Sequence, residues 1–249
     1  MNFQEANRAL YKGYLYSLIL TIVLVVAVVV AVLLILVPMH FVAESPPYHV
    51  TGSRLPQLPP AGQGEVAIGA SFALLAVVIA IAIALIAVFF LYIFRGYRAL
   101  HRLGFKWAWW LAWGPIVEIV LALVAVPIAV ISIPSAVYYD MGHQAGYPAW
   151  LDIITAAAPL LALFAIIVVI GLIINIARVI FLYDMHKYTK IGYFQISFIL
   201  YIIGLVLSLI IFSVAAGVLA TLVLFAEYIT EMLAYREASR WTPPAAPSQ

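Results

Sequence analysis

The sequence predicts an all-α protein whose helices form a polytopic transmembrane bundle with six spans. Of the 249 residues, 67% are hydrophobic and only 9% are charged, whereas soluble domains carry about 25% charged residues. Five runs contain no Asp, Glu, Lys or Arg: 13–43, 66–94, 119–139, 153–177 and 191–226. Each run exceeds the roughly 18 apolar residues that mark a candidate transmembrane helix, so we expect most of the surface to face lipid.

The expected spans are separated by segments rich in proline, glycine or basic residues. Residues 39–65 form a Pro-rich outer loop after a first span that ends at Pro38, and the tail 236–249 is polar enough to be disordered. The last apolar run is interpreted as two spans that turn near Ser213 to Gly217, because one helix would measure about 54 Å against a hydrocarbon core of roughly 30 Å. Within a single transmembrane domain, 1–235, we expect spans at about 14–37, 66–94, 115–133, 151–177, 193–211 and 216–234.

Basic residues predict the orientation of these spans. With six spans and a cytoplasmic N-terminus, eleven of the 12 Lys and Arg residues lie inside and only Arg54 lies outside. An arrangement with five spans would also place Arg236 and Arg240 outside. The positive-inside rule therefore favours six spans, and we expect a multi-pass protein of the cell (plasma) membrane with both termini cytoplasmic.

Three segments on the expected inner side resemble one another: RALYKGY (8–14), RALHRLGF (98–105) and HKYTKIGY (186–193). Each places a basic residue, a glycine and an aromatic residue before a span, which is compatible with three helical hairpins in a parallel repeat. The same features arise without any repeat, because basic and aromatic residues commonly flank inner helix ends.

Glu118 is a carboxylate within an otherwise apolar segment, WAWWLAWGPIVEIV. In a single helix from Trp107 to Pro134 it would lie near mid-membrane, where an unpaired charge costs roughly 2.5–3.5 kcal/mol. The tryptophans instead suggest an interfacial belt, and Pro115 suits a first helical turn. We therefore expect Glu118 in the first turn of a span, close to the positive end of the helix dipole and near the basic residues Arg98, Arg102 and Lys106. A proton relay or a cation site is the alternative.

Asn175 lies near the inner end of the fourth expected span. An amide at such a place usually forms a hydrogen bond to a neighbouring helix, and lining a transport path is the alternative. Glu227 and Glu231 are four residues apart, so they share one face of the last helix. We expect them to be solvated or salt-bridged, with Arg236 or Lys190 as partners of Glu231.

The expected outer loops hold a possible metal cluster of His40, His49, Asp140 and His143. Imidazole and carboxylate groups suit zinc or copper, although no fixed ligand spacing is present and loop polarity explains the same residues. No catalytic motif occurs, the net charge of +2 gives no sign of nucleic-acid binding, and we expect no cofactor.

The segment YTKIGYFQISFILYIIGLVLSLIIF (188–212), with the hairpin that follows it, resembles uncharacterised archaeal polytopic membrane proteins, which are grouped as domains of unknown function. Those proteins show a polar lead-in, a Gly-aromatic step and two closing helices. The likeness covers about the last fifty residues and the general hairpin layout. It implies a helical membrane fold and no activity.

Three functions are compatible with these features. The scarcity of polar groups within the spans favours a non-enzymatic structural or accessory subunit that packs against other membrane subunits, or against itself through the small-residue pairs Gly204–Ser208 and Ser213–Gly217. A small transporter or channel built from hairpins, with Glu118 and Asn175 along its path, is the alternative. A membrane enzyme with an outer metal site is the third possibility.

Overall fold

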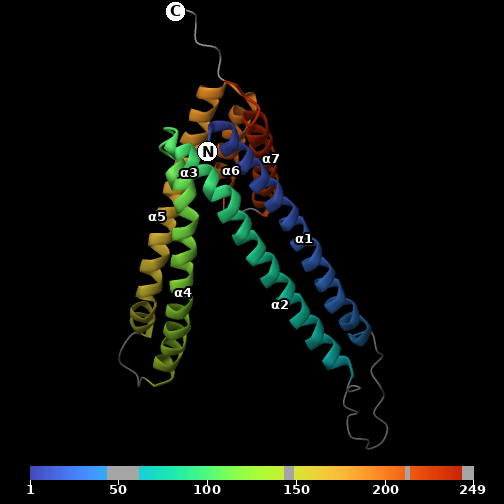
Figure 1. Cartoon of the computed structure of the whole chain (residues 1–249). Coiled ribbons are helices and arrows are strands. Elements are labelled where there is room, and N and C mark those ends of the chain that lie inside the picture. Colours follow the sequence, from blue (N-terminus) through green and yellow to red (C-terminus); the bar gives the residue numbers. More distant parts are fainter. Residues whose placement is uncertain (44–61, 143–148, 211–213, 243–249) are drawn as a thin grey trace, which may run out of the picture. The chain divides into compact units, whose positions relative to one another are not determined.

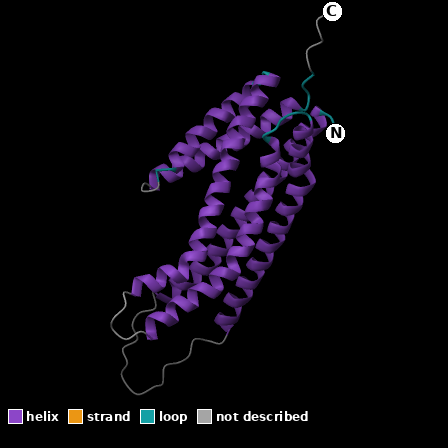
Figure 2. Cartoon of the chain, turned by 90° about the vertical axis from the view of Figure 1, so that its left-hand side faces the viewer, coloured by secondary structure: helices purple, strands orange, loops and turns teal. Residues whose placement is uncertain are grey.

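A computed structural model describes residues 1–43, 62–142, 149–210 and 214–242 of the chain. Every regular element in this described part is helical, as Figure 2 shows, because a backbone in lipid must satisfy its own hydrogen bonds. The elements in chain order (Figure 1) are α1 (Phe3–Ala43), α2 (Gly62–Val88), the π-helical turn η1 (Phe89–Phe94), α3 (Arg95–Arg102), α4 (Ala108–Gly142), α5 (Ala149–Thr189), α6 (Gly192–Ser208) and α7 (Val214–Ala238). The predicted all-α fold is confirmed.

The chain divides into two compact units. The first contains Met1–Tyr11 and Tyr92–Gln249, and the second contains Lys12–Leu91. The second unit therefore holds most of α1 and all of α2, whereas the start of α1 and helices α3 to α7 belong to the first unit. The candidate functional site lies entirely within the first unit.

Helices α4 to α7 pack in sequence order: α4 contacts α5, α5 contacts α6, and α6 contacts α7. Two glycines permit close approaches between neighbouring helices. A Cβ atom on Gly114 would lie 2.5 Å from the side chain of Ile174, and one on Gly204 would lie 2.4 Å from that of Leu224. The small residue Gly204 thus serves packing between α6 and α7 of the same chain.

Five helical segments of the described residues are long and apolar enough to cross a membrane. They are Phe3–Val30, Leu75–Arg102, Ala108–Ala125, Leu161–Thr189 and Val214–Ala238. The remaining apolar helix, α6, has 17 residues, which correspond to about 26 Å. The bundle of apolar helices is as predicted, but five segments rather than six reach full spanning length.

Several helix boundaries differ from those predicted. Helix α1 begins at Phe3 and continues past Pro38 to Ala43, so the polar N-terminal residues are helical as well. The last apolar run forms two helices, as predicted: α6 ends at Ser208 and α7 begins at Val214. The start of α7 lies within the turn predicted near Ser213 to Gly217, and Gly217 itself is helical.

The two ends of the described chain meet. The rings of Phe3 and Trp241 lie 5.5 Å apart, and the amide of Gln4 donates to the carbonyl oxygen of Trp241 at 2.9 Å. Tyr188 and Phe105 each pack on Phe3 at 5.4 and 6.1 Å. These contacts bring the start of α1 and the end of the described chain together.

Two turns near this end contain residues with positive φ. Gly104, between α3 and α4, has a φ of 104°, and Lys190, between α5 and α6, has a φ of 60°. Glycine adopts such a conformation readily, whereas the Cβ atom of a lysine makes it unfavourable by roughly 1–2 kcal/mol. These turns correspond to the second and third of the similar inner segments, while the first, RALYKGY, lies within the continuous helix α1.

Candidate functional site

Arg178 on α5 binds two carboxylates of α7. Its Nη2 atom donates to both oxygens of Glu227, at 3.1 Å each, and also to Oε2 of Glu231. The exposed fraction is 2% for the Glu227 side chain and 0% for that of Glu231, against 23% for Arg178. The site is therefore a buried ion-pair cluster between two helices that are distant in sequence.

Three hydroxyl groups supply further hydrogen bonds to the same carboxylates. Ser197 on α6 donates to Oε1 of Glu227 at 2.8 Å, and Tyr235 donates to Oε1 of Glu231 at 2.7 Å. The hydroxyl of Tyr97, on α3, lies 3.5 Å from that same oxygen and 3.1 Å from the hydroxyl of Tyr235. Side chains from α3, α5, α6 and α7 thus meet at one cluster.

Tyr201 connects this cluster to Asn175. Its ring lies 4.6 Å from the guanidinium carbon of Arg178, which allows a cation–π interaction. Its hydroxyl donates to Oδ1 of Asn175, whose amide nitrogen donates to the carbonyl oxygen of Gly171 at 2.7 Å. The expectation that Asn175 forms a hydrogen bond with a neighbouring helix is confirmed.

The helical period explains why these groups meet. Gly171, Asn175 and Arg178 are four and three residues apart on α5, so they lie on one face, and Glu227, Glu231 and Tyr235 repeat at four on α7. Glu227 lies about 20 Å along α7 from Val214. A carboxylate that is buried within an apolar helix bundle requires donors from within the protein.

Glu118 does not lie where the sequence suggested. Helix α4 begins at Ala108 and runs through Pro115, which puts Glu118 in the third turn rather than the first. The ion pairs of the described residues do not include it, so the expected pairing with Arg98, Arg102 or Lys106 is wrong. Trp109, Trp110, Trp113 and Pro115 lie inside the helix and Trp107 directly precedes it, so the argument from Pro115 as a starting residue fails.

The structure nevertheless places Glu118 beside α5. A Cβ atom on Gly171 would lie 3.4 Å from Oε1 of Glu118, and Gly171 is the residue whose carbonyl oxygen Asn175 binds. The two intramembrane polar residues singled out from the sequence therefore approach the same turn of α5. Glu118 stays partly exposed, and Asn175 is the one joined to the ion-pair cluster.

Two of the four residues of the possible outer metal cluster lie outside the described residues. His49 and His143 fall in the segments 44–61 and 143–148, while His40 and Asp140 belong to α1 and α4. The described residues contain no group of three or more His, Cys, Asp or Glu side chains that could hold a metal ion.

The ion-pair cluster was only partly foreseen from the sequence. The spacing of Glu227 and Glu231 indicated a shared face, but their partner is Arg178 and not Arg236 or Lys190. The available signal was the position of Arg178, which directly follows the charge-free run 153–177. The pairing of Arg178 with Glu227 and Glu231 requires side chains of α5 and α7 to come together, although α6 separates the two helices in sequence. Helical periodicity alone does not predict which helices are neighbours.

Comparison of the chain with protein-family models, with curated proteins and with solved structures gives no match. The class of protein is therefore defined by the fold and the ion-pair cluster alone. The chain is a helical protein apolar enough to cross a membrane several times, with a buried ion-pair cluster where α5, α6 and α7 pack.

Proposed function

We propose that the chain is a non-enzymatic subunit of a membrane complex, held rigid by the Arg178 cluster. The observation that carries this proposal is that the charged groups of the cluster bond to one another and to neighbouring hydroxyls rather than to an open site. Hydrogen-bonded polar groups in a low-dielectric interior favour one arrangement of the helices around them. The cluster therefore suits a clamp that holds α3, α5, α6 and α7 together.

The exposed apolar surface of the helices supports a role in assembly. In the most apolar part of the segment Leu161–Thr189, only 6% of the residues are buried. Exposed side chains on α5 are large and apolar, and they include Leu161, Phe164, Val168, Val169 and Leu172. Such a surface is suited to lipid or to the helices of other subunits.

An apolar replacement of the clamp tests this proposal. The variant R178M/E227L/E231M/S197A removes the charges and the hydroxyl of Ser197, whose acceptor is Glu227, while Tyr97 and Tyr235 lose Glu231 but still bond to each other. Buried ion pairs can often be replaced by apolar side chains of similar volume without loss of stability. We expect the variant to fold and to migrate with the same complex as the wild type on native gels of membrane extracts.

The result that would overturn the proposal is a wild-type chain that migrates as a lone 27.3 kDa protein under the mildest extraction. A matched control is R236Q, since Arg236 is exposed on the same helix as the two glutamates. This control removes one positive charge and leaves the clamp unchanged.

A second candidate, a cation- or proton-coupled transporter, is favoured by one specific observation. Polar groups form a line from Glu118 past Gly171, Asn175 and Tyr201 to Arg178. The cluster also holds two carboxylates for one guanidinium, so a cation or proton would balance its charge. Ionisable residues within membrane helices often mark such paths.

The same apolar variant distinguishes the two candidates. If the chain is a transporter, the variant folds but loses dye-detected proton or sodium flux in proteoliposomes. Equal flux in the variant, in the wild type and in protein-free liposomes would remove this candidate.

A further inference from the structure

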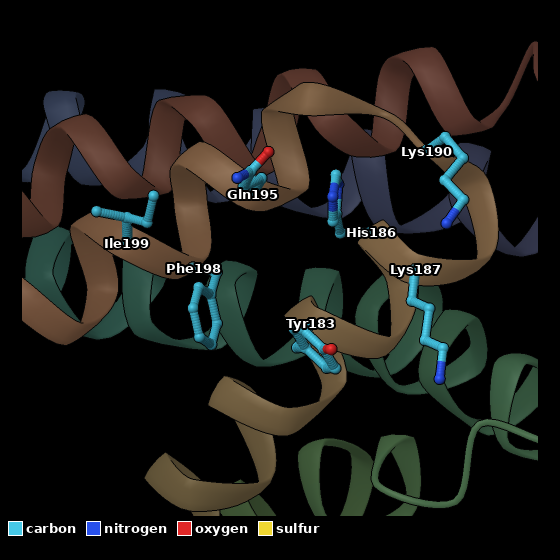
Figure 3. A pocket seen from close by; sticks show the side chains of 7 residues that line it. All are labelled: Tyr183, His186, Lys187, Lys190, Gln195, Phe198 and Ile199. Carbon is cyan, nitrogen blue, oxygen red and sulfur yellow. The ribbon is translucent and has the colours of Figure 1, made fainter.

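A pocket of about 420 Å³ lies at the corner between α5 and α6. Figure 3 shows Lys187 and Lys190 at one end of it and Phe198 and Ile199 at the other, with His186 and Gln195 between them. Tyr183 completes the lining. The pocket is therefore cationic at one end and apolar at the other.

We propose that this pocket binds an anionic membrane lipid through its phosphate group. The two ammonium groups face the phosphate, Gln195 adds an amide donor, and an acyl chain follows Phe198 and Ile199 along α6. Basic pockets next to membrane helices bind anionic headgroups for this reason. The nearest acidic residue of α5, Asp184, does not line the pocket.

The backbone at Lys190 supports a specific need for its ammonium group. Lys190 has a φ of 60°, a conformation that favours glycine, and the corresponding turn between α3 and α4 does use a glycine, Gly104. A lysine at such a position suggests a demand for its side chain that outweighs the backbone preference.

An alternative role for the two lysines is to neutralise the negative C-terminal end of the α5 helix dipole. Other groups, however, already donate hydrogen bonds to the carbonyl oxygens near that end. The hydroxyl of Thr189 donates to the carbonyl oxygen of Met185 at 2.7 Å, and the backbone N–H of Lys190 donates to that of His186 at 2.8 Å. His186 is itself fixed, with Nδ1 3.1 Å from the carbonyl oxygen of Ile191. The ammonium groups of Lys187 and Lys190 are thus not required to cap α5.

The test uses the full-length protein in a neutral detergent. Phosphatidylglycerol, phosphatidylcholine or inorganic phosphate is added, and unfolding temperature and lipid occupancy by native mass spectrometry are measured. We expect phosphatidylglycerol alone to raise the unfolding temperature and to bind as a discrete adduct. Loss of either lysine should weaken this binding about fivefold, since a basic residue near a membrane surface contributes about 1 kcal/mol towards binding anionic lipid.

The variant K190G separates binding from folding, because glycine suits the backbone there. It should unfold at the wild-type temperature or higher without lipid, yet lose the increase produced by phosphatidylglycerol; K187Q should show the same loss. The control K12Q removes an equal charge from a residue that does not line the pocket, and should respond as the wild type does.

Three results would overturn the proposal. One is an unchanged lipid response in both K187Q and K190G. Another is an equal response to phosphatidylcholine, which carries no net charge. The third is an equal response to inorganic phosphate, which would assign the pocket to a soluble anion instead of a lipid.

Discussion

Arg178 and Glu227, which lie on helices separated by the whole of α6, share two hydrogen bonds of 3.1 Å each through one guanidinium nitrogen. This pair joins α5 to α7 within the membrane-spanning part of the chain. Because Glu231 binds the same guanidinium group, one side chain holds two buried carboxylates.

Replacing Arg178 alone should destabilise the protein more than removing the whole cluster. In R178Q, both glutamates stay buried without their cation, and such a change typically costs about 3–5 kcal/mol. The unfolding temperature in detergent checks this, with the exposed Arg236 as the control position in R236Q. A fall in R178Q no larger than that in R236Q would contradict the clamp.

Gly204 should not tolerate a larger side chain. A Cβ atom there would lie 2.4 Å from Leu224, so G204L should separate α6 from α7 and cost about 1–3 kcal/mol. Gly217 provides the matched control, because a Cβ atom there meets nothing within 4 Å. G217L should unfold within a degree or two of the wild type, and equal losses in the two variants would contradict a special role of Gly204 in the packing of α6 on α7.

The sequence predicts the helices well and the contacts between them poorly. Charge-free runs reveal the helices because lipid excludes charges. Because lipid also offers no hydrogen-bond partners, the amide of Asn175 could be predicted to bond to a neighbouring helix. The position of Glu118 was predicted wrongly, because four tryptophans and Pro115 suggested that the helix starts at Pro115. The helix in fact starts at Ala108. Arg178 was missed as a partner of Glu227, since apolar helices carry little pattern that tells which faces meet.

Glu118 should be replaceable by glutamine without loss of stability. No ion pair of the described residues includes its carboxylate, and a neutral amide is easier to insert into a membrane than a charge. E118Q should therefore unfold at or above the wild-type temperature, whereas E227Q, which weakens the bonds to Arg178 and Ser197, should unfold below it. A lower temperature for E118Q would indicate a partner for Glu118.

Trp241 should hold the N-terminal helix in place. Its ring packs against Phe3 at 5.5 Å and Tyr188 at 5.3 Å, and each aromatic pair contributes about 0.5–1.5 kcal/mol. In W241A, hydrogen exchange at the amides of residues 3–10 should therefore become faster. W109A is the control, because Trp109 is 42% exposed and is remote in sequence from both termini; equal acceleration in the two variants would contradict this role.

The contact between Phe3 and Trp241 also has a consequence for biosynthesis. Gln4 and Trp241 are 237 residues apart in the sequence, so these contacts cannot form until Trp241 has been synthesised. The start of α1 must therefore remain without its contacts at Phe3 and Gln4 while helices α2 to α7 are synthesised. The aromatic cluster of Phe3, Phe105, Tyr188 and Trp241 is therefore completed only after residue 241 has been added, and a product truncated before Trp241 would leave the N-terminal residues open to quality-control proteases.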